Sequence, residues 1–280
     1  MNNYNACKVC NGAINLLNQK YDLIQCNNCK LIFCSKIYSQ SEFITLYDEL
    51  YNDENSKYNS YSVEEFNMLV ENKKIKIGFY RSRFLKKYVL NGKCNSVLEI
   101  GSGIGLIGSY IRKENEKINY TGVEIDTKAF EKSQTLKLNT INADFTEIVK
   151  IEETFDVIML WEVFEHLQDL NLFLKLAHKK LNKNGRIILS TPNYEKILNY
   201  PEREKDNLYQ DGPPIHVNFF TKESIKTIFE FNQFENCIVK VKKFPGFEVK
   251  NFNFCKNILK AIFNNFHGST IFLVATKKEY

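Results

Sequence analysis

The segment 96–105, Ser-Val-Leu-Glu-Ile-Gly-Ser-Gly-Ile-Gly, constrains the fold of this chain more than any other stretch. Its first five residues have the apolar character of a buried strand, and Gly101, Gly103 and Gly105 follow at once. Glycines allow a tight turn and a close approach of the backbone to a ligand, and the first turn of a following helix offers unpaired N–H groups. The segment therefore predicts a strand, a ligand-binding turn and a helix, which together open a parallel α/β sheet.

From residue 96 onward, strand patterns and helical patterns alternate along the sequence. Strand patterns occur at 96–100, 119–124, 140–143, 155–160, 185–191, 237–242 and 271–277. Helical patterns occur at 104–114, 127–137, 168–181 and 221–231. This alternation predicts an α/β domain over 96–280 with a mostly parallel sheet, interrupted near its end by an insertion at about 244–267.

The glycine spacing alone leaves the ligand open. Gly103, Gly105 and Gly108 also satisfy the spacing of a dinucleotide-binding turn, with Glu124 about 20 residues further on, so a nicotinamide enzyme would fit. Glu99 favours a cationic ligand, because a carboxylate beside the turn would attract the ammonium and sulfonium of S-adenosylmethionine (SAM) but not a pyrophosphate. Glu124 and Asp144 follow at the next two strand ends, placed to accept from the ribose hydroxyls and the adenine amino group. Three acids at successive strand ends favour SAM.

The fourth strand runs into the sequence Leu160-Trp-Glu-Val-Phe-Glu-His-Leu167. Together with Glu-x-Gly-x-Gly-x-Gly at 99–105, it resembles the class I SAM-dependent methyltransferases, and most closely the small-molecule enzymes with a Glu-Val-x-Glu-His-Leu signature. Segments 190–193 and 212–221 resemble that group's fifth-strand end and following loop and helix. The resemblance covers 96–277 and implies a Rossmann-like, seven-stranded, mostly parallel sheet with an antiparallel last strand.

The resemblance also implies which residues bind SAM. They share a position at the carboxyl ends of the first four strands, where parallel sheets bind ligands. The expected cofactor-binding residues are Glu99, Gly101, Ser102, Gly103, Gly105, Glu124, Ile125, Asp144, Phe145, Leu160 and Trp161.

Three side chains are candidates for catalysis. Methyl transfer is an in-line displacement, so the protein positions the acceptor and, for a hydroxyl, removes its proton. His166 follows the fourth strand and His216 lies in a Gly-Pro-Pro loop after the fifth, so both are expected to face the cofactor. Either histidine is a candidate general base, with Glu162 as the alternative. Each also has a structural interpretation, as a hydrogen-bonded histidine or as a wall of the SAM pocket.

Two Cys-x-x-Cys pairs, Cys7/Cys10 and Cys26/Cys29, stand 15 residues apart, which is the spacing of a four-cysteine zinc site. So short a fragment cannot bury enough apolar surface to fold alone, so a metal must stabilise it. Four thiolates leave no open coordination position, which predicts structural Zn²⁺ rather than catalytic. We expect a zinc-ribbon module over 1–34 that shapes or covers the acceptor pocket; buried thiols and a redox pair are the alternatives.

A tyrosine-rich and helical segment, 35–95, joins this module to the sheet. Its tyrosines are candidates for a lid over SAM and acceptor, or for ordinary half-buried surface residues. The lid candidates are Tyr47, Tyr51, Tyr58 and Tyr61. From 62 to 90, apolar residues recur at helical spacing, and Asn91-Gly92 is a helix stop.

Composition narrows the partners. The 280 residues include 44% hydrophobic and 25% charged residues, which excludes a disordered chain. The net charge of +5 comes from scattered lysines and arginines rather than a basic arm, which argues against a nucleic-acid partner. The sequence has no secretory pattern and no apolar run of about 18–20 residues, so we expect a cytoplasmic protein without a membrane partner.

These observations predict a SAM-dependent methyltransferase that acts on a small-molecule acceptor. Analogy with similar enzymes suggests O-methylation of a sugar, nucleotide-sugar or phosphorylated metabolite, as in surface-polysaccharide biosynthesis. An Asn/Asp-Pro-Pro-Tyr motif for planar nitrogen is absent. The alternatives are an RNA or protein methyltransferase that docks through its zinc module, and a SAM-fold binding protein without activity. The oligomeric state stays open.

Overall fold

The computed structural model of the chain describes residues 2–39, 41–43, 45, 57–71, 75, 77–196, 212–241, 258–259, 262–263 and 268–279. Tyr47, Tyr51 and most of the 244–267 insertion lie outside these residues. Tyr58 and Tyr61 belong to helix α2 (Lys57–Val70), in which side chains are described only from Val63. The lid therefore stays a prediction.

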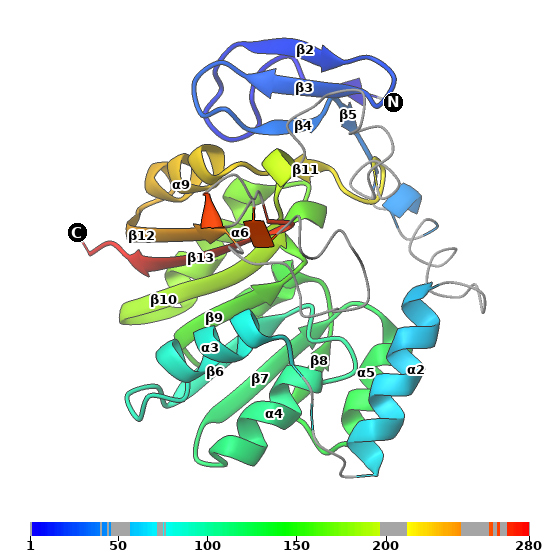
Figure 1. Cartoon of the computed structure of the whole chain (residues 1–280), viewed down its shortest axis with the longest axis vertical. Helices are drawn as coiled ribbons and strands as arrows, with labels where there is room; N and C mark the ends of the chain where they lie inside the picture. Colours follow the sequence, from blue (N-terminus) through cyan, green and yellow to red (C-terminus); the bar gives the residue numbers. More distant parts are fainter. Residues whose placement is uncertain are drawn as a thin grey trace.

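A seven-stranded sheet forms the centre of the molecule, in the order β12-β13-β10-β9-β6-β7-β8 (Figure 1). Its strands are β6 (Ser96–Ile100), β7 (Asn119–Glu124), β8 (Thr140–Asn142), β9 (Phe155–Trp161), β10 (Leu181–Pro192), β12 (Phe234–Val241) and β13 (Thr270–Lys277). Strands β6 to β10 pair in parallel, and β13 lies antiparallel between β10 and β12. The predicted sheet is confirmed, and its order reverses at β6, between β7 and β9.

Helices cover both faces of this sheet. On one face lie α3 (Phe79–Tyr88) and α4 (Leu106–Glu114), which pack on strand residues such as Val97 and Val157. On the other lie the 3₁₀ helix η1 (Phe145–Lys150), α6 (Leu170–Lys180) and α9 (Lys222–Phe231), which pack on Leu98 and Ile158. Helix α5 (Thr127–Thr135) contacts β7 and β8. Neighbouring residues of one strand thus serve two cores, as the alternation of side chains along a strand requires.

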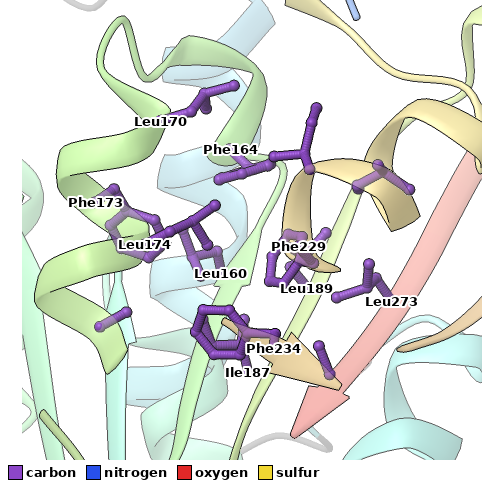
Figure 2. Close-up of a cluster of buried hydrophobic side chains, with 14 of the residues drawn as sticks. Leu160, Phe164, Leu170, Phe173, Leu174, Ile187, Leu189, Phe229, Phe234 and Leu273 are labelled. Carbon is purple, nitrogen blue, oxygen red and sulfur yellow. The ribbon is translucent and has the colours of Figure 1, made fainter. Parts of the chain in front are cut away.

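Aromatic rings fill the second core next to the candidate site. Figure 2 shows Phe164, Phe173 and Phe229 gathered between α6, α9 and the sheet. The Phe164 ring stacks on Phe220 with 5.0 Å between centroids and lies 5.6 Å from Phe229. Phe164 belongs to the turn η2 (Phe164–His166), so this packing anchors the two residues that follow it.

The helical stretch expected at 62–90 is interrupted. It contains the end of α2 and all of α3, and extended Gly78 precedes α3. Glycine is a poor helix former, so it favours a break between two helices over one continuous helix. Among the residues that the structure describes, no helix is long and apolar enough to cross a membrane.

The N-terminal module is a small antiparallel sheet. It contains β2 (Ile14–Asn18), β3 (Leu23–Cys26) and β4 (Ile32–Cys34), while β1 (Asn2–Asn3) pairs with β5 (Lys36–Ile37). Its fourth strand is β11 (Asn218–Phe219), which comes from the loop region after β10 and pairs with β4. Figure 1 shows the module, in blue, seated over β11. The α/β domain therefore completes the module's own sheet.

Candidate functional site

The glycine turn after β6 leaves open space at one position. Gly101, Gly103 and Gly105 have φ angles of +69°, +54° and +85°, in the left-handed region that favours glycine. A Cβ atom at Gly101 would lie 2.5 Å from Val163, and one at Gly105 would lie 2.3 Å from Leu138. A Cβ atom at Gly103 would meet none of the described atoms within 4 Å. The first and third glycines therefore serve protein packing, whereas Gly103 borders a space that a ligand can fill.

Glu99 is a buried carboxylate beside this turn. Its side chain is 2% exposed, and the Tyr120 hydroxyl donates a hydrogen bond to its Oε2 at 2.6 Å. Burial raises the pKa of Glu99 to about 8, although the Tyr120 hydrogen bond and the charge of Arg81 act in the opposite direction. Glu99 therefore holds a proton near pH 7 in the absence of a ligand and would lose that proton when a cation binds beside it, as the expected SAM contact requires.

Glu124 holds the turn in place from the end of β7. Its Oε2 accepts from the Gly103 N–H at 2.6 Å, and its Oε1 accepts from the Asp126 N–H at 2.9 Å. Burial raises the pKa of Glu124, and these backbone hydrogen bonds oppose that rise. A carboxylate offers about four acceptor positions, so two remain for ribose hydroxyls. The sequence predicted the ligand role but not this positioning role.

The other expected cofactor residues have varied surroundings. Asp144 Oδ1 accepts from the Thr146 N–H at 2.9 Å and so caps η1. The Leu160 side chain is fully buried in the core beneath α6 and α9, so only the backbone atoms of this residue are available to contact a ligand. Trp161 is nearly buried, with Arg81 lying 5.2 Å from its ring, and its Nε1 has no hydrogen-bond partner in the described part of the chain. A ligand bound at the glycine turn after β6 would give this buried indole N–H group a hydrogen-bond acceptor.

The remaining expected cofactor-binding residues, Ser102, Phe145 and Ile125, differ in their exposure to solvent. Ser102 is buried and donates its N–H to the Val123 carbonyl at 3.1 Å. Phe145 packs edge-on against Phe173 with 5.7 Å between ring centroids, and Ile125 is 54% exposed. These positions surround the carboxyl ends of β6, β7 and β8, beside the switch point between β6 and β9 at which parallel sheets bind ligands.

The two candidate histidines come together at the end of β9. The rings of His166 and His216 lie 4.8 Å apart between centroids, and His166 Nδ1 lies 2.9 Å from the Ile215 carbonyl oxygen. Glu165 joins them: one ligand atom from each of the three residues lies within 4.8 Å of the others. The sequence analysis missed Glu165, although its place next to His166 and three residues after Glu162 was a usable signal.

Two residues at the end of β10 support the glutamates. The Ser190 hydroxyl donates to Glu162 Oε1 at 2.6 Å, and the Thr191 hydroxyl donates to Glu165 Oε2 at 3.0 Å. Glu162 itself has a left-handed φ of +57°, which is uncommon outside glycine and asparagine and marks a constrained turn. The signature of the fourth strand therefore folds into one buried acidic and imidazole cluster.

Burial sets the charge state of the imidazoles. It lowers the pKa of His166, and it lowers the pKa of His216 to about 3, with a further contribution from neighbouring His166. Both rings are therefore neutral near pH 7. A base with so low a pKa is poorly matched to a proton transfer at neutral pH, which makes His216 a weaker general base than its position suggests.

The module holds the loop that carries His216. The Cys34 N–H donates to the Val217 carbonyl at 3.0 Å, and the Val217 N–H donates to the Glu165 carbonyl at 3.1 Å. The Asn218 amide donates to the carbonyls of Glu165 at 3.1 Å and Leu167 at 2.8 Å. Strand β4, the loop and turn η2 therefore form one hydrogen-bonded unit.

Further hydrogen bonds join the module and its linker to the region around α6. The Tyr38 N–H donates to the Gln168 side chain at 2.9 Å, and that amide returns a hydrogen bond to the Tyr38 carbonyl at 2.9 Å. Asn171 donates to the carbonyls of Lys8 at 3.1 Å and Val9 at 2.9 Å, beside the first cysteine pair. The module is thus fixed to the helix that follows the acidic turn.

The four cysteines of the module converge. Cys7 and Cys29 have their Sγ atoms 3.5 Å apart, those of Cys10 and Cys26 are 3.4 Å apart, and all four lie within 4.8 Å of one another without a disulfide. A tetrahedral zinc with bonds of about 2.3 Å separates its sulfurs by about 3.8 Å. Backbone N–H groups of Val9 and Asn28 also point at Cys7 and Cys26 sulfurs. The donor set and its size fit zinc.

Comparison with known proteins places this arrangement in a family. Residues 75–238 match a family described as a methyltransferase domain. The fold is similar to that of a SAM-dependent methyltransferase from Archaeoglobus fulgidus, with a TM-score of 0.56 at 19% identity over 84% of this chain and 100% of that one. Identity at this level supports the fold alone.

Two curated relatives differ in what they methylate. The chain is 27% identical over 129 residues to a ubiquinone biosynthesis O-methyltransferase of Pelagibacter ubique, covering 42% of this chain and 53% of that protein. It is 31% identical over 132 residues to a tRNA (guanine-N(7)-)-methyltransferase of Mycoplasma mobile, covering 41% of this chain and 65% of that protein. The chain thus spans about half to two thirds of the length of these relatives.

Proposed function

Since this chain belongs to the methyltransferase-domain family, within the class I SAM-dependent methyltransferases, we propose that it transfers the SAM methyl group to an oxygen of a small molecule. One observation carries the proposal: the open glycine turn of β6 and the cluster of half-buried Glu162 and His166 with buried Glu165 and His216 lie at neighbouring strand ends. Strands β6 and β9 pair directly, so both groups border the same edge of the sheet. A cofactor at one and an acceptor at the other would be adjacent.

The residues of the turn fit the charge and hydrogen-bonding groups of SAM. Gly103 has open space at its Cβ position, Glu99 would supply a negative charge to a bound cation, and Glu124 fixes the turn while offering acceptors to ribose. When bound, SAM supplies an electrophilic methyl group on a sulfonium. The protein then has to orient the acceptor in line with that group and exclude water.

The acceptor side favours a neutral hydroxyl. Half-buried Glu162 and buried Glu165 line it, and burial raises the pKa of both carboxyls, so these side chains favour a neutral, hydrogen-bonding group over a charged phosphate at the reacting end. A sugar, nucleotide-sugar or phosphorylated metabolite, as expected from the sequence, would therefore present a hydroxyl here and keep any phosphate away from this turn. The O-methyltransferase relative supports oxygen as the methylated atom.

The zinc module serves this site as a scaffold. Its zinc would hold β3 and the two cysteine turns, and β4 would in turn fix the loop of His216 through β11. The tRNA-methylating relative keeps an RNA acceptor as the second candidate. Against that candidate, Lys8 of the module is half-buried and Lys36 pairs with Asp22, which leaves few lysines for phosphate contacts.

The test is transfer of radiolabelled methyl from SAM to a size-fractionated extract of cells that lack the gene. Gly103→Ala and Gly92→Ala form a matched pair, because both glycines have left-handed φ angles and open space at Cβ, but only Gly103 borders the proposed cofactor space. Label in the small-molecule fraction, weakened by Gly103→Ala and unchanged by Gly92→Ala, is the expected result. Label in RNA or protein would replace the small-molecule acceptor, and equal loss in both variants would contradict the cofactor assignment.

A further inference from the structure

Tyr120, in β7, shares a face of the sheet with Glu99, in β6. In the pairing of these parallel strands Glu99 stands opposite Gly122, and Tyr120 lies two residues before Gly122. Side chains two residues apart on a strand point to the same face, which here is the face that α4 covers (Figure 1). Because Gly122 has no side chain, the Tyr120 side chain can lie along its own strand and reach Glu99.

Two glycines leave the space that the Tyr120 ring occupies. A Cβ atom at Gly108, in α4, would lie 2.5 Å from Cζ and 2.9 Å from the hydroxyl oxygen of Tyr120. A Cβ atom at Gly122 would lie 3.0 Å from the same hydroxyl oxygen. Gly108 is the third glycine of the spacing that also fits a dinucleotide-binding turn. In this structure a side chain at Gly108 would displace a buried phenol, which gives this glycine a role in the cofactor site.

The Tyr120 hydroxyl holds one oxygen of Glu99 and leaves the other open. It donates to Glu99 Oε2 at 2.6 Å, and both residues are buried. Burial and the neighbouring Glu99 carboxylate raise the pKa of Tyr120 well above its ordinary value of 10, so the hydroxyl stays a donor near neutral pH. Glu99 Oε1 accepts no hydrogen bond from the described residues, so it is available to a ligand.

From this arrangement we propose that Tyr120 is a positioning residue of the cofactor site, whose hydroxyl fixes one oxygen of Glu99 and presents the carboxylate to the cationic part of SAM. The inference rests on the proposed cofactor role of Glu99, and it concerns SAM binding rather than methyl transfer. Two further charged groups face Glu99: Arg81, from α3, favours the ionised carboxylate, and Glu124, at the end of β7, disfavours it. The hydrogen bond from Tyr120 acts more strongly on the Glu99 pKa than either of them.

Removal of the hydroxyl should change how SAM affinity depends on pH. A hydrogen bond to a charged group contributes about tenfold, so the midpoint of the pH dependence should move upward by about one pH unit in Tyr120→Phe. Because SAM would bind the ionised form of Glu99, affinity at about pH 7 should fall about tenfold. Near pH 9 most of the carboxylate is ionised in both proteins, so the difference should narrow to about twofold.

Calorimetric titration of SAM between about pH 6 and pH 9 measures this profile. Tyr120→Phe keeps the ring that lies between the two glycines, so the variant should fold. Tyr110→Phe is the matched control, because Tyr110, in α4, is also buried in the same core but its hydroxyl makes no recorded hydrogen bond to Glu99. This control should keep the pH profile of the wild type.

A double-mutant cycle separates positioning from a purely structural role. In Glu99→Gln the pH dependence should disappear, and adding Tyr120→Phe should then change SAM affinity by less than about threefold. A loss of affinity in Tyr120→Phe that is equal at every pH, or that persists in full in the Glu99→Gln background, would overturn the inference. A Tyr120→Phe profile identical to that of the wild type would overturn it as well.

The outcomes also separate this inference from the assignments on which it rests. Wild-type SAM affinity and pH slope in Glu99→Gln would refute the cofactor role of Glu99, and the role of Tyr120 with it. Loss of the slope in Glu99→Gln, together with an unchanged Tyr120→Phe profile, would refute the role of Tyr120 alone. The expected profiles without methyl transfer to any acceptor would uphold Tyr120 and count against the proposed function only.

Discussion

The N-terminal module and the seven-stranded sheet reach stability by different means. The sheet buries apolar side chains on both faces, with helices supplying the second layer on each. The module contributes only three short strands to its larger sheet, and its buried residues, such as Leu31 and Phe33, belong to the same core as α6 and α9. A domain of ordinary size can fold by burial, whereas a fragment this small needs a metal and a neighbour.

The two regions also divide the proposed chemistry. The glycine turn of the cofactor site is formed by residues at the ends of β6 and β7. Within the described residues, no hydrogen bond joins this turn to the module. The loop of His216 depends on the module, because β4 pairs with β11 and Cys34 binds the Val217 carbonyl. We therefore expect changes in the module to affect acceptor chemistry while sparing SAM binding.

The largest expected effect is loss of the zinc. Cys29→Ser removes a buried thiolate, and structural zinc contributes about 10–16 kcal/mol of apparent binding free energy in small zinc peptides. Zinc content should fall from about one equivalent to near zero, and proteases should cut within residues 2–39 while the sheet stays intact.

Cys94→Ser is the control, because Cys94 is also buried but lies in the sheet core and donates only to the Ser96 carbonyl. Elemental analysis and limited proteolysis measure both outcomes. Full zinc occupancy in Cys29→Ser would show that the four sulfurs do not form the site.

The next largest effect is expected at Asn218, which joins strand β11 to turn η2 and the residue after it. Asn218→Ala removes an amide that donates to the Glu165 and Leu167 carbonyls in a buried setting. Leaving buried carbonyls unpaired costs about 1–3 kcal/mol, so the free energy of unfolding in urea should fall by that amount and kcat/KM by about tenfold. Asn119→Ala, at an exposed position of β7 with an ordinary φ angle, should change neither quantity. Unchanged kinetics in Asn218→Ala would mean that the loop needs no support.

The sheet region should show a pH dependence of SAM binding that arises at Glu99. Burial raises the pKa of Glu99 from 4.5 to about 8, so the cofactor-free protein holds a proton there at pH 7. A bound cation lowers that pKa and releases the proton, so SAM affinity should rise with pH, by up to about tenfold per unit, and level off near pH 8.

Calorimetry in buffers of different ionisation enthalpy measures the released proton, and Glu99→Gln should abolish the slope. Stability has the opposite sign: because the folded pKa lies above the unfolded one, this group's contribution is full below pH 4.5 and is lost as pH rises through about 8. A slope that persists unchanged in Glu99→Gln would assign the proton to another residue.

The smallest expected effect is on the contact between the module and α6. Asn171→Ala removes two hydrogen bonds to the Lys8 and Val9 carbonyls at a half-buried position. About 1 kcal/mol of local stability should be lost, which corresponds to roughly fivefold faster zinc release to a chelator. A release rate equal to that of the wild type would show that the module does not depend on this helix.

The sequence was sufficient for features that follow local patterns. The apolar runs of β6 and β9, the glycine turn and the cysteine spacing each left a signal within a few residues, and the sheet and the cysteine cluster follow them. Features made by distant partners left none. Strand β11 has only two residues and no periodicity, and the hydrogen bond that orients Glu165 comes from Thr191 on another strand. The hydrogen bond from Gly103 to Glu124 likewise joins residues 21 positions apart.

One measurement tests the division between the two regions most directly: SAM affinity and methyl transfer, determined side by side for the wild type and zinc-free Cys29→Ser. The account predicts a SAM dissociation constant within about threefold of the wild type and a transfer rate lower by more than about a hundredfold, since the loop of His216 would lose its support. Loss of SAM binding together with zinc, or transfer at the wild-type rate without it, would contradict the account.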